Sequence, residues 1–414
     1  MARTLPVDPL RIGLLGSGFI ANFHLQALLG VRHVQVAGVY SPTPARRDAL
    51  VAKANAMGLG PCRAFDSVEA LAASDEIDAI WILGPNFTRL EQMRAIHRAV
   101  AQRSTPLLGV ACEKPLARTL AEGREMLRLA EDAGLNHGYL ENQVFSTAIQ
   151  RGKDIIWRRG VPATGRPYLA RAAEEHSGPH APWFWRGDLQ GGGVLLDMMC
   201  HSVEVARYLL TDPSKDRTSL RVRSANGTVA NLKWAQPKFA KRLQERMGAD
   251  IDYTRRPAED FARGVVTLED EAGNPLIIET TTSWSYVGPG LRIQVELLGP
   301  EYALEFSSLN TPLKIFLSRE VTGAQGEDLV EKQNSEQGLM PVVEDEPGIY
   351  GYTLEDRHMV ECFRTGQRPI ETFHDGVAVL EILMALYRSA ELGRTVELPD
   401  PALEDYVPPV ARVG

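Results

Sequence analysis

Short apolar runs rich in β-branched residues alternate with amphipathic stretches over the first third of the chain. The runs predict buried strands, and apolar residues spaced three to four apart predict helices. Parallel strands need crossover connections, which helices supply, so the alternation predicts a doubly wound parallel sheet. The expected strands are residues 11–15, 34–40, 79–83, 107–112 and 136–140, and helices include 43–57, 88–102 and 119–133.

After residue 140 the pattern changes to extended segments with few helices between them. This pattern predicts a second, α+β domain with a large, open, mostly antiparallel sheet and helices on one face. Polar connections near residues 237–260 and 320–352 are expected to be insertions, lids or oligomer contacts. The expected strands are 166–173, 219–234, 264–269, 276–285, 291–298 and 313–318, and the expected helices are 145–159, a glycine-led helix after residue 193, 353–364 and 375–393.

Composition narrows the classes of partner. The 414 residues carry a net charge of -8, which gives no basic surface for nucleic acid or an anionic membrane. The four cysteines lie far apart without a C-x-x-C pair, which argues against a disulfide framework or a structural zinc site. Neither a signal-peptide pattern nor a membrane-spanning apolar run is present, so we expect a soluble, cytoplasmic protein with a small-molecule partner.

A glycine motif, G-S-G-F-I-A at residues 16–21, directly follows the first expected strand. In the G-x-G-x-x-G/A motif the first glycine makes a tight turn and the second lets a pyrophosphate approach the backbone. The motif therefore predicts a Rossmann dinucleotide-binding domain over residues 1–140, with residues 141–414 left for the substrate and for oligomerisation. Its cofactor contacts are expected at Gly16, Gly18, Phe19 and Ile20.

The end of the second strand bears on the choice between NAD and NADP. An acidic residue there would bind the ribose hydroxyls of NAD, but this chain has Ser41 at that place. Arg46 and Arg47 open the next helix, where a guanidinium can meet a 2′-phosphate. The pattern favours NADP, and NAD remains open.

Two further motifs bear acid–base chemistry. Lys114 comes at the end of a strand and is followed by proline, at the sheet edge where doubly wound proteins bind their ligands. Asp197 and His201 lie four apart on the helix that follows Gly191, Gly192 and Gly193, so both face the same side. A carboxylate can orient such an imidazole for proton transfer.

Taken together, the motifs at 16–21, at 113–115 and at 191–201 resemble the Gfo/Idh/MocA oxidoreductases, and the match in order and spacing covers essentially the whole chain. The resemblance implies oxidation or reduction of sugars, polyols and their derivatives with NAD(P). It also implies that Lys114, Asp197 and His201 form the catalytic set. It further suggests a homodimer or homotetramer built through the exposed face of the second sheet.

The resemblance extends to segments that border the cofactor, with departures. It places Pro85, Asn86, Glu113 and Asn142 beside the cofactor together with Lys114. Family members commonly have an Asn-His-x-His-like element after the fourth strand, whereas here only the asparagine is kept. Many members also have an arginine or aromatic residue after the tyrosine of the sixth strand, whereas this chain has Leu140 and Glu141 after Tyr139. The substrate of a well-known member is therefore not transferred to this chain.

A loop rich in aromatic and hydrogen-bonding residues precedes the three glycines. Such a loop suits a sugar, which stacks its apolar face and hydrogen-bonds through its hydroxyls. We expect His176, His180, Trp185 and Arg186 to bind substrate with Lys114, Asp197 and His201. The histidines and nearby carboxylates match no specific metal-ligand spacing, so no metal is predicted.

The residues lead to a hydride-transfer hypothesis. His201 would remove the hydroxyl proton while hydride leaves for the nicotinamide, Asp197 would orient His201, and Lys114 would stabilise the alkoxide. Two alternatives stay open. One is a glycosidase that oxidises its substrate transiently and returns the hydride, and the other is a non-catalytic NAD(P)-binding sensor.

Overall fold

The computed structural model describes residues 9–248, 253–254, 257–318 and 338–412. Its contacts divide the chain into two compact units. Unit 1 comprises Met1–Ser146 and Tyr350–Ala378, and unit 2 comprises Thr147–Ile349 and Val379–Gly414. Unit 1 is thus assembled from two segments separated by some two hundred residues of sequence.

Unit 1 is built on a parallel sheet whose strand order is β3-β2-β1-β4-β5-β6. This order is that of a Rossmann domain, and it confirms the doubly wound parallel sheet expected from the sequence. The strands are β1 (Leu10–Leu15), β2 (Val34–Tyr40), β3 (Arg63–Ala64), β4 (Ala79–Ile82), β5 (Gly109–Glu113) and β6 (Asn136–Leu140).

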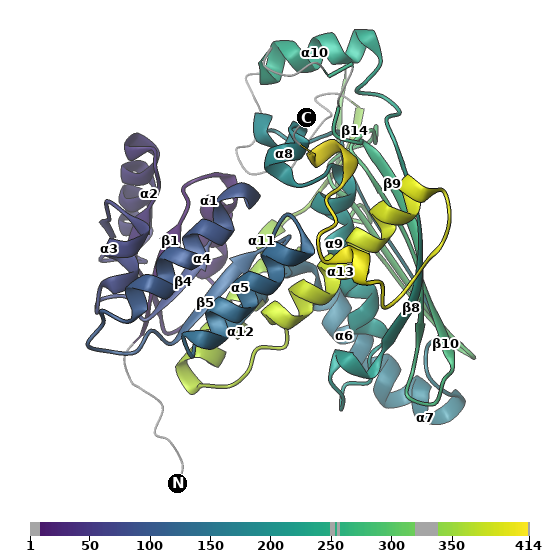
Figure 1. The fold of residues 1–414 in the computed structure, drawn as a ribbon, viewed down its shortest axis with the longest axis horizontal. Coiled ribbons are helices and arrows are strands. Elements are labelled where there is room, and N and C mark those ends of the chain that lie inside the picture. The colour runs from purple at the N-terminus through teal and green to yellow at the C-terminus, as the bar shows by residue number, and fades with distance from the viewer. Residues whose placement is uncertain (1–8, 249–252, 255–256, 319–337, 413–414) are drawn as a thin grey trace. The chain divides into compact units, whose positions relative to one another are not determined.

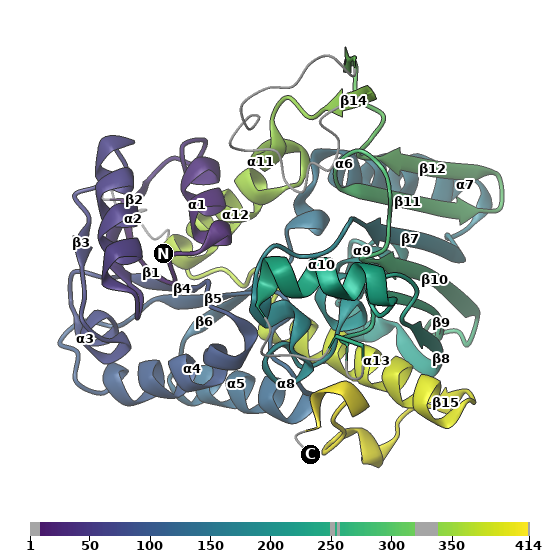
Figure 2. The ribbon, with the colours of Figure 1, turned by 90° about the horizontal axis from the view of Figure 1, so that it is seen from above.

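Helices cover both sides of this sheet. Figure 2 shows α1 and α12 on one side and α3, α4 and α5 on the other. The strands between them are buried because helices cover both faces of a parallel sheet. In β4 (Ala79–Ile82), for example, every residue is buried. The helices are α1 (Phe19–Leu28), α2 (Pro44–Ala56), α3 (Val68–Ala73), α4 (Asn86–Val100), α5 (Leu120–Asp132) and α12 (Tyr352–Thr365).

Unit 2 is built on a mixed, mostly antiparallel sheet in the order β12-β11-β7-β10-β9-β8-β15, which can be followed in Figure 2. Among the described strand pairs of this sheet only β7–β10 is parallel, and the long connection between these two strands contains helices and two further strands. The sheet confirms the expected architecture. Its strands are β7 (Leu169–Glu175), β8 (Arg221–Ala230), β9 (Phe261–Glu269), β10 (Pro275–Ser283), β11 (Arg292–Gly299), β12 (Tyr302–Ser307) and β15 (Val396–Glu397).

The helix α9 (Val194–Leu210) packs against β7, β9 and β10 on one face of this sheet (Figure 1). Nearly every residue of α9 is buried, which fixes the orientation of the polar residues on it. The other described elements of unit 2 are α6 (Thr147–Ile155), a π-helical turn (Ile156–Gly160), α7 (Val161–Thr164), α8 (Gly187–Gln190), α10 (Pro237–Met247), β13 (Leu313–Leu317), β14 (Gly338–Val342) and α11 (Glu346–Ile349). The long helix α13 (Phe373–Leu392) begins in unit 1 and continues in unit 2.

The outer face of the second sheet carries charge. Arg171 pairs with Glu279 at 2.6 Å and with Glu296 at 3.2 Å, across three neighbouring strands. An oligomer through this face stays a prediction. Parts of the two expected insertions, residues 249–252, 255–256 and 319–337, lie outside the described residues. None of the helices in the described part of the chain has the length and hydropathy needed to span a membrane.

Candidate active site

The glycine loop after β1 has the geometry that its motif requires. Gly16 has φ 134°, and a Cβ there would lie 2.9 Å from the carbonyl oxygen of Leu83. At Gly18, which precedes the first turn of α1, an added Cβ would meet no atom within 4 Å. Gly16 thus allows the chain to turn against the next strand, while open space lies beside the helix N-terminus, where a phosphate is stabilised.

The end of β2 lies against this loop. Ser17 Oγ and Ser41 Oγ are 2.7 Å apart, so the residue that replaces the expected acid is held beside the glycines. The two arginines of α2 differ. Arg47 donates to Asp66 at 3.0 Å and to the carbonyl of Phe65 at 3.2 Å, whereas Arg46 is exposed and pairs with no described residue.

The loop that carries Lys114 is fixed by a buried arginine that the sequence reasoning did not single out. Arg89 of α4 donates from Nε to the carbonyl of Gly84 at 3.0 Å and from Nη1 to the carbonyl of Glu113 at 2.7 Å. A further hydrogen bond reaches the carbonyl of Pro115. Arg89 therefore ties the loop after β4, with its neighbours Pro85 and Asn86, to the loop after β5.

Glu113 and the residues after β6 are buried around half-buried Lys114. The backbone N–H of Lys114 donates to Glu113 Oε2 at 3.0 Å. Asn142, which follows β6, donates to the carbonyl of Tyr350 at 2.8 Å. Burial raises the pKa of the neighbouring Glu141 to about 8, against the opposing charge of Lys114. This second carboxyl group, which the sequence reasoning did not select, is therefore protonated at neutral pH.

In unit 2, the helix α9 presents the predicted acid–base pair in a buried setting. Asp197 is 4% exposed, and its Oδ2 accepts a hydrogen bond from the indole of Trp284 at 3.3 Å. His201 is 3% exposed, and its Nε2 lies 3.9 Å from Glu174 Oε2 at the end of β7. A carboxylate at this distance stabilises an imidazolium. Glu174, which the sequence analysis did not select, thus lies beside the predicted base.

Two of the three glycines before α9 are explained by the side chains packed against them. Tyr387 of α13 donates to Glu259 and accepts hydrogen bonds from the N–H groups of Gly193 at 2.9 Å and Leu196 at 3.2 Å. A Cβ at Gly192 would lie 2.1 Å from the Tyr387 hydroxyl, and one at Gly193 would lie 2.5 Å from the Glu259 carboxyl group. The glycines thus admit a tyrosine and a glutamate that satisfy the first turn of the helix.

The predicted substrate loop divides into buried and exposed residues. His176 is fully buried, and its Nδ1 accepts from the N–H of Gly178 at 2.9 Å. Trp185 is also buried and donates to the carbonyl of Pro179 at 3.3 Å. His180 is exposed, and Arg186 pairs with Asp188 at 2.8 Å, so these two lie nearer solvent. Contact with substrate stays a prediction for all four.

Two consecutive stretches of the chain match the two domains of one family. Residues 10–156 match the family described as "Oxidoreductase family, NAD-binding Rossmann fold", and residues 165–398 match its "C-terminal alpha/beta domain". The chain belongs to the Gfo/Idh/MocA oxidoreductase family. The resemblance seen in the sequence is thereby confirmed.

Individual relatives of this Gfo/Idh/MocA protein are distant. The 1,5-anhydro-D-fructose reductase of Ensifer adhaerens is 30% identical over 212 residues, which are 51% of this chain and only 59% of the reductase. The D-apiose dehydrogenase of Paraburkholderia graminis is 25% identical over 400 residues, 96% of this chain and 92% of that enzyme. The structure of GenD2 from gentamicin A biosynthesis in complex with NAD shares the fold, with a TM-score of 0.75 and 23% identity. The match covers 97% of this chain and 100% of the GenD2 chain.

A buried charged network lies beneath the lysine loop of this family member and was not foreseen. His24 of α1 contacts Glu113 Oε1 through Nε2 at 3.1 Å and both Asp356 oxygens through Nδ1 at 3.0 Å. Trp81 also donates to Asp356 at 3.0 Å. Burial alone would lower the pKa of His24, but Asp356 and Glu113 outweigh it and raise the pKa to about 10.

The network around His24 includes one further buried carboxyl group. Burial would raise the pKa of Glu113, yet the hydrogen bond from His24 lowers it, so Glu113 stays ionised. Glu355 is fully buried, and burial together with the nearby acids raises its pKa well above the usual range. A charged His24 therefore lies between two carboxylates, next to a carboxyl group whose pKa is raised. The signal for His24 is a histidine among the apolar residues of α1.

Proposed function

We propose that the protein is a nicotinamide-dependent dehydrogenase that acts on a CH–OH group of a sugar, a cyclitol or a derivative of one. The observation that carries the proposal is the buried pair Asp197 and His201 on α9, in a chain whose other unit fixes Lys114 at the end of a Rossmann strand. Two relatives, a 1,5-anhydro-D-fructose reductase and a D-apiose dehydrogenase, support the substrate class.

The residues present suit a dinucleotide. Open space at Gly18 beside the N-terminus of α1 accepts a pyrophosphate, and Ser41 lies next to the loop. When bound, the nicotinamide supplies the hydride acceptor or donor. All remaining chemistry is assigned to side chains of this chain.

In the proposed oxidation, His201 takes the proton of the substrate hydroxyl. Glu174, 3.9 Å from the ring, stabilises the positive charge that His201 acquires. Asp197, which Trp284 holds through a hydrogen bond of 3.3 Å, orients the imidazole. Lys114 donates to the same substrate oxygen and stabilises its developing negative charge.

A panel of monosaccharides, cyclitols, anhydrosugars and glycosides tests the proposal. With NAD or NADP present, we expect at least one class to give a stoichiometric rise in reduced cofactor. Release of sugar from a glycoside without net reduction would instead indicate the redox-neutral glycosidase. Binding of the cofactor without its reduction and without cleavage of any glycoside in the panel would indicate a non-catalytic NAD(P)-binding sensor.

We further propose that NADP is the preferred cofactor. Ser41 brings no carboxylate that would repel a 2′-phosphate, and Arg46 is exposed and pairs with no described residue. Arg46→Ala is expected to raise the KM for NADP about tenfold, a loss of ~1.4 kcal/mol, and to change the KM for NAD little.

Arg47→Ala is the matched control, because it removes the same charge one residue later. Arg47 is already engaged by Asp66 and the carbonyl of Phe65, so its loss should leave the NADP to NAD ratio unchanged. Steady-state kinetics with both cofactors measure the effect. An equal change in both KM values for Arg46→Ala would contradict the assignment.

A further inference from the structure

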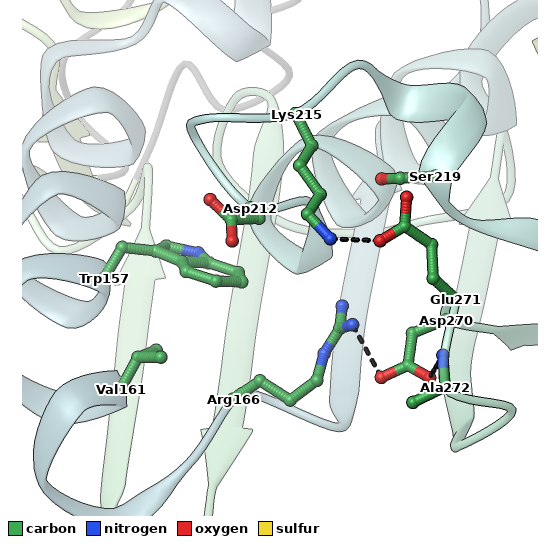
Figure 3. A pocket seen from close by; sticks show the side chains of 9 residues that line it. All are labelled: Trp157, Val161, Arg166, Asp212, Lys215, Ser219, Asp270, Glu271 and Ala272. Atoms are coloured by element: carbon green, nitrogen blue, oxygen red, sulfur yellow. Dashed lines mark hydrogen bonds and ion pairs between the residues drawn. The ribbon is translucent and has the colours of Figure 1, made fainter.

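The charges of two hollows formed by described residues of unit 2 are arranged differently. Figure 3 shows the first, of about 260 Å³, in which Arg166 pairs with Asp270 at 2.9 Å and Lys215 pairs with Glu271. Its cations are therefore neutralised by acids of the same hollow. The second, of about 390 Å³, lies by α10 and has no acidic residue among the described residues that line it. It is large enough for a monosaccharide-sized group.

Three cations line this second hollow. They are Lys233, Arg242 and Arg246, and none of them has an ion-pair partner among the described residues. Burial lowers the pKa of Lys233, the nearby Asp260 carboxylate opposes this shift, and the charges of Arg242 and Arg246 lower the pKa further, so both arginines lie near enough to repel the Lys233 ammonium. A bound anion would relieve this repulsion.

Aromatic rings complete the hollow. Lys233 Nζ lies 4.5 Å from the ring centroid of Trp234 and 5.6 Å from that of Phe239, and Arg242 Cζ lies 5.7 Å from the latter. Tyr286 contributes a further ring to the wall. The combination of ring faces with cations that have no acidic partner in the described part of the chain matches a ligand that has both a carbohydrate body and an anionic group.

The loop that bears Lys233 and Trp234 is fixed from beneath. Asp260 is fully buried, and its carboxylate accepts hydrogen bonds from the N–H groups of Leu232 at 2.7 Å and of Lys233 and Trp234 at 2.8 Å. This carboxylate is engaged by backbone and does not line the hollow. These hydrogen bonds fix the backbone from which the side chains of Lys233 and Trp234 reach the wall of the hollow.

Two hydrogen bonds connect the hollow to the predicted acid–base pair. The indole of Trp234 donates to the carbonyl of Trp284 at 2.8 Å, and the indole of Trp284 donates to Asp197 at 3.3 Å. On another side, the lining residue Ser177 directly follows His176 of the predicted substrate loop. The hollow thus adjoins the predicted substrate loop and is connected to the predicted acid–base pair.

We propose that Lys233, Arg242 and Arg246 bind an anionic group of the substrate, a carboxylate or a phosphate, in the hollow walled by Trp234 and Phe239. This inference rests on the proposed function and narrows its substrate class to acidic sugar derivatives, such as a sugar acid or a sugar phosphate. The segment around α10, whose role the sequence left open, becomes a specificity element.

Matched substrates and variants test the inference. Glucose is compared with glucuronate and with glucose 6-phosphate, and myo-inositol with its monophosphate, in kcat/KM with the preferred cofactor. We expect an acidic member of a pair to exceed its neutral counterpart by about tenfold or more. Comparison of glucuronate with glucose 6-phosphate shows whether the site prefers a carboxylate or a phosphate. Preference for neutral members in every pair would overturn the inference.

Arg242→Gln is expected to lower kcat/KM for the acidic substrate about tenfold, mainly through KM, and to leave a neutral substrate unchanged. Lys241→Gln is the control, because Lys241 is exposed on the same helix and does not line the hollow. Equal effects of the two variants would overturn the assignment of the site.

Calorimetric titration of the full chain with glucuronate and glucose 6-phosphate separates this inference from the proposed function. Binding that Arg242→Gln weakens and Lys241→Gln does not, without turnover of any sugar, would retain the anion site and reject the dehydrogenase. Turnover of neutral sugars, with no binding of either acid, would retain the dehydrogenase and reject the anion site.

Discussion

Lys114→Met is expected to lower kcat by about 10²- to 10⁴-fold while the variant still folds and binds cofactor. Methionine keeps the length of the side chain but removes the charge that stabilises the alkoxide. The backbone stays anchored, because Glu113 accepts from the N–H of residue 114 and Arg89 holds the carbonyls on either side. His201→Asn is expected to cause a loss of similar size by removing the base.

Steady-state rates and the quenching of protein fluorescence by reduced cofactor measure the two effects separately. Lys53→Met is the control in unit 1, because this lysine donates to Asn22 at 2.9 Å on the surface of α2 and has no proposed role in catalysis. Near-normal rates in both the Lys114 and His201 variants would contradict the mechanism.

His24→Leu is expected to lower the free energy of unfolding by about 3–5 kcal/mol, because it leaves Glu113 and Asp356 buried without the cation between them. It should also lower activity, since Glu113 would no longer be held against the N–H of Lys114. Urea denaturation of the cofactor-free protein measures the change. His97→Leu, on a partly exposed position of α4, should cost less than about 0.5 kcal/mol.

The pH dependence of stability gives a second measurement on His24. Its folded-state pKa of about 10 lies above the unfolded value of 6.5, so the folded protein binds the extra proton between these values. The stabilisation is therefore complete below pH 6.5 and is lost as the pH rises towards 10. The wild type should show this decline and His24→Leu should lack it; parallel curves would contradict the assigned charge.

The sequence predicted the elements whose patterns are long and regular. Strands β2 and β6 have the expected bounds, and the glycine-led helix α9 lies where it was placed. The short strand β3 was missed because its two exposed residues carry no apolar pattern. Strand β12 was missed because it is an edge strand without fully buried positions, although Gly299-Pro300 before it is a turn signal.

At the candidate site, the sequence revealed the residues that stand in local motifs. Gly16, Lys114, Asp197 and His201 are recognisable from their spacing to neighbours. Their supporting partners are not, because pairing across the chain leaves no local pattern. His24 and Asp356 are 332 positions apart, and Tyr387 is 128 positions from Glu259.

The segmented make-up of unit 1 has a consequence for synthesis of the chain on the ribosome. When residue 146 has been made, His24 and Glu113 are both present, but Asp356 and the rest of α12 have not been translated. The Rossmann sheet of the nascent chain therefore lacks α12 until residues 147–349 of unit 2 have been translated. A chain released before α12 is made would therefore hold an incomplete Rossmann unit, in which His24 has Glu113 as its partner and lacks Asp356.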